Sequence, residues 1–380
     1  MMEREPQDIL NELEEKNIPV YSFSRIETIN NCLYEAYRTY ILEDKDMAQN
    51  NVYAIMGGKI HDVLEKIMNN EATEKDLLPA MNQELEDMDM LGIEFPKGRD
   101  GSDSIKQGWI ADMTHFCNTY KAPKGKFETE TFFLYETPKH HYLQGYIDLT
   151  RIRKDGLLEI YDYKTSSMYK GEEIKKHGRQ LVLYALGKEQ QRYKIKSINW
   201  IMLKYCVVSY IGKKRSNSKE ESEITKIVER KNLVKELESV IETKLWKLGL
   251  DEIDVEIILD DAKRKNEIPE QITNEFKIKP YVMNYELTDE IRQECNEYID
   301  STIEMWENLD SSNESQYEHI PFTKTKVIKK KHEDGTEYEE NKTTEDCFYC
   351  YSLCGYTKKC PHFQTYLDTK EVSKENDDLW

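Results

Sequence analysis

The chain has 380 residues, of which 38% are hydrophobic and 11% aromatic, and this composition supports a packed core and excludes wholesale disorder. The 73 acidic residues outnumber the 54 basic ones, so the formal net charge of -19 argues against non-specific coating of DNA or anionic membranes. Residues 1–20 lack the apolar segment of a signal peptide, and no apolar run approaches the ~20 residues that span a membrane. We therefore expect a cytoplasmic protein with reduced cysteines.

Helical periodicity dominates the first third of the chain. Helices are predicted at 7–16 and 24–42, after the Gly57-Gly58 pair, around 74–91 and around 103–121. Apolar and polar residues then begin to alternate, and this predicts strands within 126–136, 141–153 and 157–166. A helix at 173–190 and a buried β-rich run at 197–210 follow. This order of elements predicts an α/β protein.

The second half is more highly charged. Residues 212–250 read as a polar loop and then a long helix, 276–290 contain a further strand, and 287–308 form another helix. Residues 323–344 have the pattern of a β-hairpin that turns at Asp334-Gly335.

The third predicted strand carries an acid and a lysine two residues apart, Asp162 and Lys164, in an otherwise apolar run. A three-residue loop at 154–156, with Gly156 free to adopt positive φ, would join it to the preceding strand. In that register Asp148 lies directly opposite Asp162, about 5 Å away between Cα atoms. Facing carboxylates repel, and a bound Mg²⁺ would relieve the repulsion. With Lys164 placed to hold or deprotonate a water, the pattern indicates metal-assisted phosphodiester hydrolysis; an ordinary charged surface hairpin is the alternative.

Two helical pairs at i and i+4 could join this site. His61 and Glu65 share one helical face, and His61 could add an imidazole to the metal. Gln180 and Tyr184 follow the acid–lysine strand closely and could grip a nucleic-acid backbone or order Lys164. A structural histidine and a polar helix edge are the respective alternatives.

Four of the eight cysteines crowd into residues 347–360, and in a reducing compartment such crowding indicates a metal site rather than disulfides. Three other cysteines lie in helix- or strand-like segments and are interpreted as packing residues: Cys117, Cys206 and Cys295.

The segments GGKIHDVLE, GYIDL, YDYKTS and QLVLY, in that order, resemble the PD-(D/E)XK nucleases, specifically the RecB/AddB-like branch that includes the CRISPR-adaptation nucleases. The pattern of that branch is a helical His, then G-x-D, D/E-x-K and Q-x-x-x-Y, and the resemblance is good over 20–210. It implies a restriction-endonuclease-like core, in which helices flank a mixed central β-sheet.

The resemblance also implies roles for individual residues. Mg²⁺ or Mn²⁺ would be bound by Asp148 and Asp162, with His61 as a further ligand. The implied catalytic set is Asp148, Asp162, Lys164, Gln180 and Tyr184. Either Glu128 or Glu130 would correspond to the acid that opens the core sheet.

Members of this branch often hold a [4Fe–4S] cluster through one cysteine before the helical His and three near the C-terminus. By that pattern the ligands are Cys32, Cys347, Cys350 and Cys360. The late spacing departs from the family's C-x2-C-x5-C, and Cys354 is the alternative for one C-terminal place. A local Zn²⁺ site of the four C-terminal cysteines, with Cys32 as an ordinary buried thiol, is the competing interpretation.

The leading hypothesis is a metal-dependent DNA nuclease, an exonuclease or end-processing enzyme of DNA repair, recombination or phage- or CRISPR-type DNA processing. Its substrate would be DNA that is single-stranded or has free ends, a separate helicase or recombination protein could be its partner, and no membrane is involved. A non-catalytic nucleic-acid-binding subunit or a zinc-stabilised scaffold is the alternative. Candidate DNA-contacting cations are Lys59, Lys164, Lys170, Lys175, Lys176, Arg179 and the basic runs at 212–215 and 324–331, and an ordinary solvated surface is the alternative, favoured for most of them.

The expected organisation has four parts. Residues 1–212 hold the N-terminal helices and the nuclease core, and 213–320 form a charged, mainly helical region with one further strand. Residues 321–365 form the hairpin and the Cys-cluster segment, packed back on the core near Cys32, and 366–380 form an acidic flexible tail.

Overall fold

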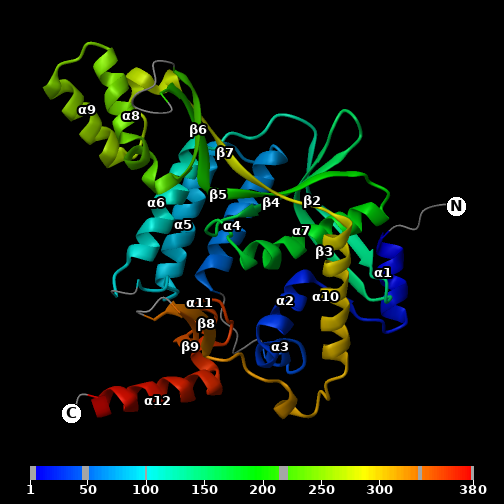
Figure 1. The fold of residues 1–380 in the computed structure, drawn as a ribbon. Helices are drawn as coiled ribbons and strands as arrows, with labels where there is room; N and C mark the ends of the chain where they lie inside the picture. Colours follow the sequence, from blue (N-terminus) through cyan, green and yellow to red (C-terminus); the bar gives the residue numbers. More distant parts are fainter. Residues whose placement is uncertain (1–5, 45–50, 99–100, 214–220, 333–335, 378–380) are drawn as a thin grey trace.

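The computed structural model describes residues 6–44, 51–98, 101–213, 221–332 and 336–377 (Figure 1). A seven-stranded mixed sheet lies at the centre, and helices flank it. The predicted α/β class, with helices around a mixed central sheet, is therefore confirmed.

The sheet has the strand order β1-β3-β4-β5-β6, with β2 paired to β3 and β7 paired to β5. The pairs β1/β3 and β4/β5 are parallel and the others are antiparallel. The strand bounds are β1 Val20–Tyr21, β2 Phe127–Glu136, β3 Tyr142–Ile152, β4 Leu158–Lys164, β5 Ile195–Gly212, β6 Ser222–Glu229 and β7 Phe276–Tyr285.

The β3–β4 hairpin has the predicted register. Leu149 pairs with Tyr161, so one further step along both strands sets Asp148 opposite Asp162. Gly156 has φ +80°, a conformation that costs glycine little, and this allows the tight loop that fixes the register. The matched positions of the two acids follow from this loop.

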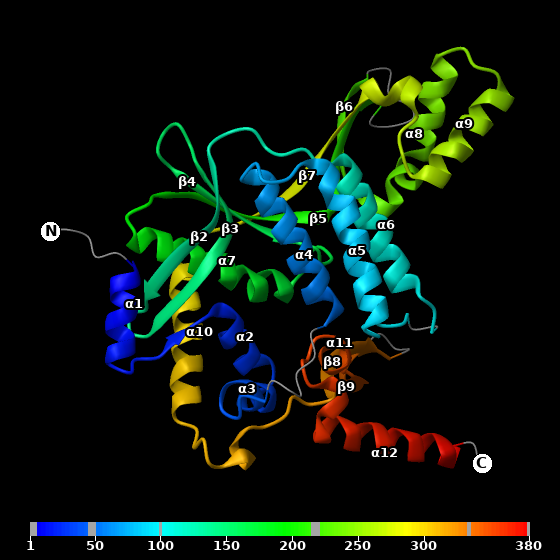
Figure 2. The ribbon, with the colours of Figure 1, turned by 180° about the vertical axis from the view of Figure 1, so that it is seen from behind.

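Helices cover both faces of the sheet (Figures 1 and 2). One apolar core joins the sheet to α2, α3, α7 and α10, and a second joins it to α4, α5 and α6. The helix bounds are α1 Pro6–Glu15, α2 Phe23–Asn31, α3 Leu33–Tyr40, α4 Val52–Met68, α5 Leu77–Met90, α6 Ser104–Thr119, α7 Glu172–Gln190 and α10 Asp289–Glu307. None of the described helices is long and apolar enough to cross a membrane.

Two glycines let α7 lie very close to the sheet. A Cβ at Gly178 would lie 2.4 Å from Cζ of Tyr285, and a Cβ at Gly187 would lie 2.4 Å from Cδ2 of Phe133. Both ring atoms belong to strand residues, so only glycine fits at these positions unless the rings move. The glycines therefore set the height of α7 above β2 and β7.

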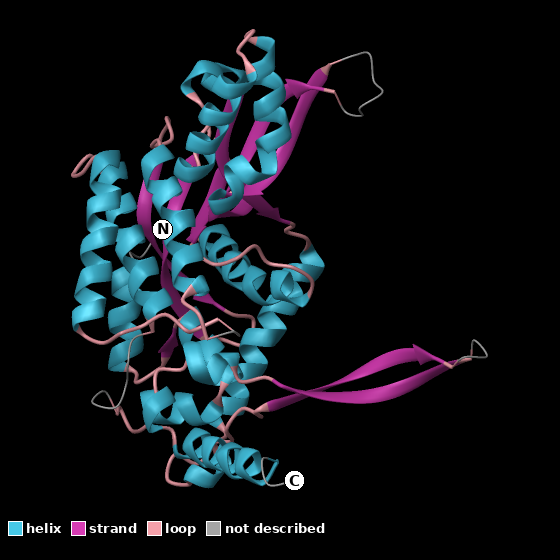
Figure 3. Ribbon diagram, turned by 90° about the vertical axis from the view of Figure 1, so that its left-hand side faces the viewer, coloured by secondary structure: helices cyan, strands magenta, loops and turns pink. Residues whose placement is uncertain are grey.

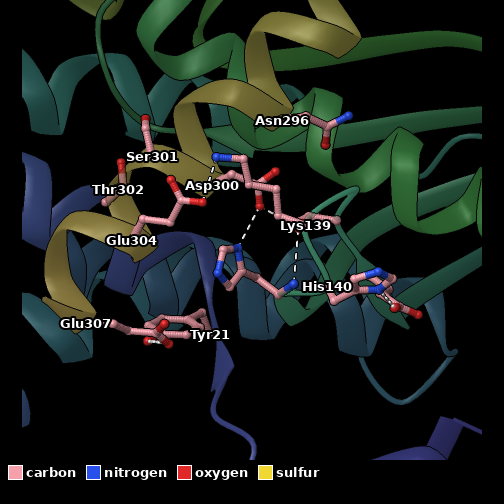
Figure 4. Close-up of polar contacts among 12 residues, drawn as sticks. Tyr21, Lys139, His140, Asn296, Asp300, Ser301, Thr302, Glu304 and Glu307 are labelled. Atoms are coloured by element: carbon pink, nitrogen blue, oxygen red, sulfur yellow. Dashed lines mark hydrogen bonds and ion pairs between the residues drawn. The ribbon is translucent and has the colours of Figure 1, made fainter.

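Polar contacts tie α10 to the N-terminal part of the sheet (Figure 4). Nδ1 of His141, the residue before β3, lies 2.7 Å from Oδ1 of the buried Asp300. Tyr21 Oη donates a hydrogen bond of 2.9 Å to Oε1 of Glu307. These contacts hold α10 beside the strands.

Two predictions for the N-terminal helices were wrong. The helix expected at 24–42 is interrupted at Cys32, whose φ of -157° and ψ of 110° are extended rather than helical. The glycine pair does not precede a helix, because α4 begins at Val52 and contains Gly57 and Gly58.

The region after β5 forms an arm at one end of the sheet (Figure 1). β6 and β7 extend with the long β5, and α8 Leu233–Lys247 and α9 Glu252–Lys265 pack on them around a third apolar core. Residues 212–250 were predicted to hold a polar loop and one long helix, but they hold β6 and then α8, and α9 lies beyond that range. Because β6 was not predicted, the region after β5 holds two strands rather than one. Residues 214–220, which include part of the 212–215 basic run, lie outside the described residues.

The C-terminal segment contains β8 Thr323–Lys331, β9 Glu337–Glu345, α11 Phe348–Ser352 and α12 Pro361–Asp377. Figure 3 shows the β8–β9 hairpin extending away from the body of the molecule. The pairing of the two strands matches the predicted hairpin, while Asp334 and Gly335 of its predicted turn lie outside the described residues. Residues up to 377 continue α12, so a helix stands where a tail was expected from 366.

Candidate active site

The candidate site lies where β3 and β4 separate after the Leu149–Tyr161 pair. Beyond this point β3 pairs with β1 and β2, whereas β4 pairs with β5. Asp148 Oδ2 accepts a hydrogen bond of 2.8 Å from the backbone nitrogen of Tyr163. Asp162 is 1% exposed. We call this point of separation the fork. It brings together two carboxylates from neighbouring strands.

Lys164 ends β4 and is held from two sides. Its Nζ lies 2.7 Å from Asp162 Oδ2 and donates to Gln180 Oε1 at 3.0 Å. Gln180 Nε2 donates in turn to Tyr184 Oη at 2.8 Å. Burial, the largest single influence, would lower the pKa of Lys164, but the charge and hydrogen bond of Asp162, with the charges of Tyr169 and Asp148, together outweigh burial, and the pKa is raised. Gln180 thus holds the Lys164 side chain, and Tyr184 in turn holds Gln180. Both side chains face the site and do not simply form a polar edge of the helix.

His61 reaches the fork from α4. Its Nδ1 lies 3.4 Å from Asp148 Oδ2, and its ring makes an edge contact with Tyr163 at 5.8 Å between centroids. Burial lowers the pKa of His61, which favours the neutral imidazole that binds metals. Burial also raises the pKa of Asp162, and the charge of Asp148 adds to the effect of burial while that of Lys164 opposes it.

The structure separates the two glutamates of β2. Glu130, with φ +44°, occupies the position that continues the β2–β3 register opposite Asp148. Loss of surrounding water, and then repulsion by Asp148 and Glu65, raises the pKa of Glu130 to about 7. Glu128 is directed elsewhere, 3.9 Å from Lys126 Nζ. Glu130, Asp148 and Asp162 therefore form an acidic row across three strands.

One site neighbour carried no sequence signal. Glu27 of α2 is half-buried. Burial raises the pKa of Glu27, and the charges of Lys176 and Lys164 offset only part of that rise. The sequence pattern does not distinguish Glu27 from a solvent-exposed acid of an amphipathic helix; only the fold brings Glu27 near Lys164 and Asp162.

The acidic row has the carboxylate ligands of a cation site but not a closed arrangement. Within the described ranges, no three His, Cys, Asp or Glu side chains stand closely enough together to hold a metal ion, so His61, Asp148 and Asp162 do not form a preformed cage. The donor set nonetheless fits a hard divalent cation, because carboxylate oxygens are its preferred ligands. Asp162 Oδ2 also fits: it is buried, and apart from its ion pair with Lys164 it receives no hydrogen bond from the described residues.

The cysteine segment packs against the interruption between α2 and α3. Cys32, Cys347, Cys350 and Cys360 belong to one buried cluster with Tyr34 and Phe363. Burial raises the pKa of Cys350 to about 12, and the neighbouring cysteines, Cys32 first among them, add to the effect. Cys354 is also buried, and its Sγ accepts from the backbone nitrogen of Tyr356 at 3.4 Å. These thiols lie among the described residues, yet they too are not set in the tight arrangement of a metal site.

A buried acid holds the cysteine segment in place. Glu35 of α3 accepts a hydrogen bond of 2.9 Å from the backbone nitrogen of Gly355 and a second from Tyr349 Oη. Asn51, which caps α4, donates to the carbonyl oxygen of Leu353 at 3.2 Å. The segment therefore contacts both α3 and the helix that carries His61.

Most of the predicted DNA-contacting cations near the motifs already have partners. Lys59 pairs with Glu84 at 3.0 Å, and Lys175 and Arg179 share Glu294. The lysines of the 324–331 run are largely exposed on β8. The basic surface close to the fork is therefore smaller than the sequence predicted.

The fold agrees with the comparison to known families. The model of the PD-(D/E)XK nuclease superfamily matches residues 20–361, and the chain belongs to this superfamily. The central sheet with its flanking helices is its restriction-endonuclease-like core, and the chain is of the nuclease class, whose members usually use Mg²⁺ or Mn²⁺. A comparison with curated proteins finds no match.

Proposed function

We propose that the protein is a metal-dependent deoxyribonuclease of the RecB/AddB-like branch that hydrolyses phosphodiester bonds at DNA ends. Repair, recombination and phage- or CRISPR-type DNA processing are the settings in which such an activity acts, alone or beside a separate helicase. The observation that carries the proposal is the fork, where two carboxylates, a lysine and its ordering glutamine converge.

Each residue at the fork has a role in this proposal. Asp148, Asp162 and His61 would hold the cation, which when bound supplies a Lewis acid and lowers the pKa of an attacking water. Lys164, held by Gln180, is placed to donate a charge-assisted hydrogen bond to a phosphate oxygen. A non-catalytic binding subunit has no need for an acid and a lysine held 2.7 Å apart in a buried site, so the catalytic function is favoured.

The cysteine cluster has a structural role in the same proposal. A [4Fe–4S] cluster on Cys32, Cys347, Cys350 and Cys360 would join the start of the core to its end, and four thiolates are the ligand set such clusters take. Cys354 competes for one place, and the alternative is a local zinc site made by the four C-terminal cysteines without Cys32. Iron, sulfide and zinc content of the purified protein, with the visible absorption spectrum, separates the two occupants.

The catalytic proposal is tested with end-labelled linear and circular DNA, single- and double-stranded, in Mg²⁺ or Mn²⁺. Wild type is expected to degrade linear DNA and spare circles. Lys164→Ala is expected to lose at least about 100-fold in rate, and Lys154→Ala, which removes an exposed lysine from the β3–β4 loop, is the matched control. Equal rates for wild type and Lys164→Ala would end the proposed mechanism.

A further inference from the structure

A pocket of about 650 Å³ opens directly beside the fork. Thr165, Ser166 and Ser167, which follow Lys164 along the chain, form part of its wall. The rest comes from the N-terminal turns of α4 and α6, from α7, β5 and the residues before α8, and from α11 of the cysteine segment, which lies near those helix ends (Figures 1 and 2). Its volume is within the range of small-molecule sites.

Aromatic side chains make up much of the pocket wall. The rings of Tyr169 and His177 stack with 4.2 Å between centroids and 18° between planes. Phe348 of α11 also lines the pocket and is 58% exposed, an unusual exposure for a phenylalanine. Trp109 is 3% exposed, and its Nε1 donates no hydrogen bond to any described residue. Such a wall is suited to a planar ring that carries hydrogen-bonding edges.

Two lysines approach the pocket from its polar side. Lys204 of β5 is 9% exposed, and among the described residues its Nζ has a single partner, Oδ2 of the buried Asp112, in a long ion pair of 3.5 Å. Lys231 Nζ lies 3.7 Å from the same oxygen and is hydrogen-bonded to Glu229 at 2.9 Å. Glu173, an exposed acid on α7, is the acidic residue of the lining. Lys204 is therefore the cation with donor capacity left for a phosphate.

We propose that this pocket holds an unpaired nucleotide of a single DNA strand, next to the phosphate being cleaved. The base lies against the aromatic wall and a backbone phosphate meets Lys204. A base inside a duplex is paired and stacked and does not enter without being flipped out, so the pocket selects single-stranded DNA or frayed ends. The inference rests on the proposed nuclease function and adds its strand preference.

The first test measures binding without divalent cations, so that no cleavage occurs. Phe348→Ala is expected to weaken binding of a fluorescent single-stranded oligonucleotide by about 5-fold or more and to leave duplex binding unchanged. Tyr351→Ala is the matched control, because Tyr351 lies on the same helix, is 49% exposed and does not line this pocket. Equal single-strand affinity for the two variants would overturn the proposal that this pocket binds a nucleotide.

A second variant tests the phosphate contact. Lys204→Gln is expected to reduce the dependence of log K on log salt by about 0.7 for single strands, the value for one phosphate contact. An unchanged salt slope in a folded Lys204→Gln would remove Lys204 from the site. Cleavage assays on wild type separate the two proposals: cleavage with no Phe348 effect overturns only the pocket, whereas absence of cleavage in Mg²⁺ and Mn²⁺ overturns the nuclease function on which it rests.

Discussion

The backbone nitrogen of Tyr163 donates a hydrogen bond to Asp148 Oδ2 at 2.8 Å, just beyond the last backbone pair of β3 and β4. One carboxylate thereby satisfies a backbone donor at the point where the strands part, and it stays beside Asp162. This explains why a strand built for burial carries an acid and a lysine near its end: its final residues line a fork rather than the core.

Asp148→Asn and Asp148→Ala separate the two roles of this side chain. The Asn variant keeps an oxygen for the Tyr163 nitrogen but loses the charge, so we expect wild-type stability with a cleavage rate at least about 100-fold lower. The Ala variant also leaves the nitrogen unsatisfied and is expected to lose a further ~1–3 kcal/mol in free energy of unfolding. Denaturant unfolding and single-turnover cleavage measure the two effects, and equal stability of both variants would contradict the role in the fork.

Gly178→Ala tests the close approach of α7. The new Cβ would meet the ring of Tyr285, so we expect a loss of about 1–3 kcal/mol in unfolding free energy and lower activity, because α7 carries Gln180 and Tyr184. Gly58→Ala is the control: Gly58 is exposed in α4 with no described atom within 4 Å of its added Cβ, so alanine should stabilise by about 0.5–1 kcal/mol. Equal shifts in the same direction would show that the packing of α7 is loose.

Cys32→Ser tests the cysteine cluster. We expect loss of the bound iron and a lower melting temperature, because Cys32 is the proposed cluster ligand that comes from the start of the core. Cys117→Ala removes a cysteine buried in a different core and should leave the metal content unchanged. Full metal content in Cys32→Ser would instead support a local site made by the C-terminal cysteines.

Asp112 makes a pH-dependent contribution to stability. Burial raises its pKa to about 6, although the hydrogen bond from the Lys231 nitrogen and the charge of Lys204 act in the opposite direction. The unfolded chain releases this proton near pH 4 and the folded chain near pH 6, so this group lowers the free energy of unfolding as pH rises between those values, by at most about 3 kcal/mol. In Asp112→Asn that decline should be absent. Urea unfolding at several pH values measures it, and identical pH profiles for variant and wild type would refute it.

The local pattern of the sequence was enough to predict the hairpin and the matched positions of the two acids, but not that the strands separate there. Alternation and a glycine turn fixed which residues of β3 and β4 face each other, and so brought Asp148 and Asp162 together. The choice between Glu128 and Glu130 follows from the β2–β3 register, which sets Glu130 opposite Asp148 and which the alternation of the sequence did not fix.

Long-range packing accounts for what the sequence did not predict. The extended conformation of Cys32 interrupts a stretch with continuous helical periodicity, and β6 has too little apolar alternation to stand out before it pairs with β5. The pocket at Phe348 joins segments more than 180 residues apart and has no local signature.

The most direct measurement of the central claim is single-turnover cleavage of end-labelled single-stranded DNA by wild type and Asp162→Asn, with and without Mg²⁺ or Mn²⁺. The fork predicts cleavage by wild type only when the cation is present, and a rate at least about 100-fold lower for Asp162→Asn, while both bind the DNA equally well in a chelator. Cleavage by Asp162→Asn at the wild-type rate would contradict the assignment of the fork as the catalytic centre.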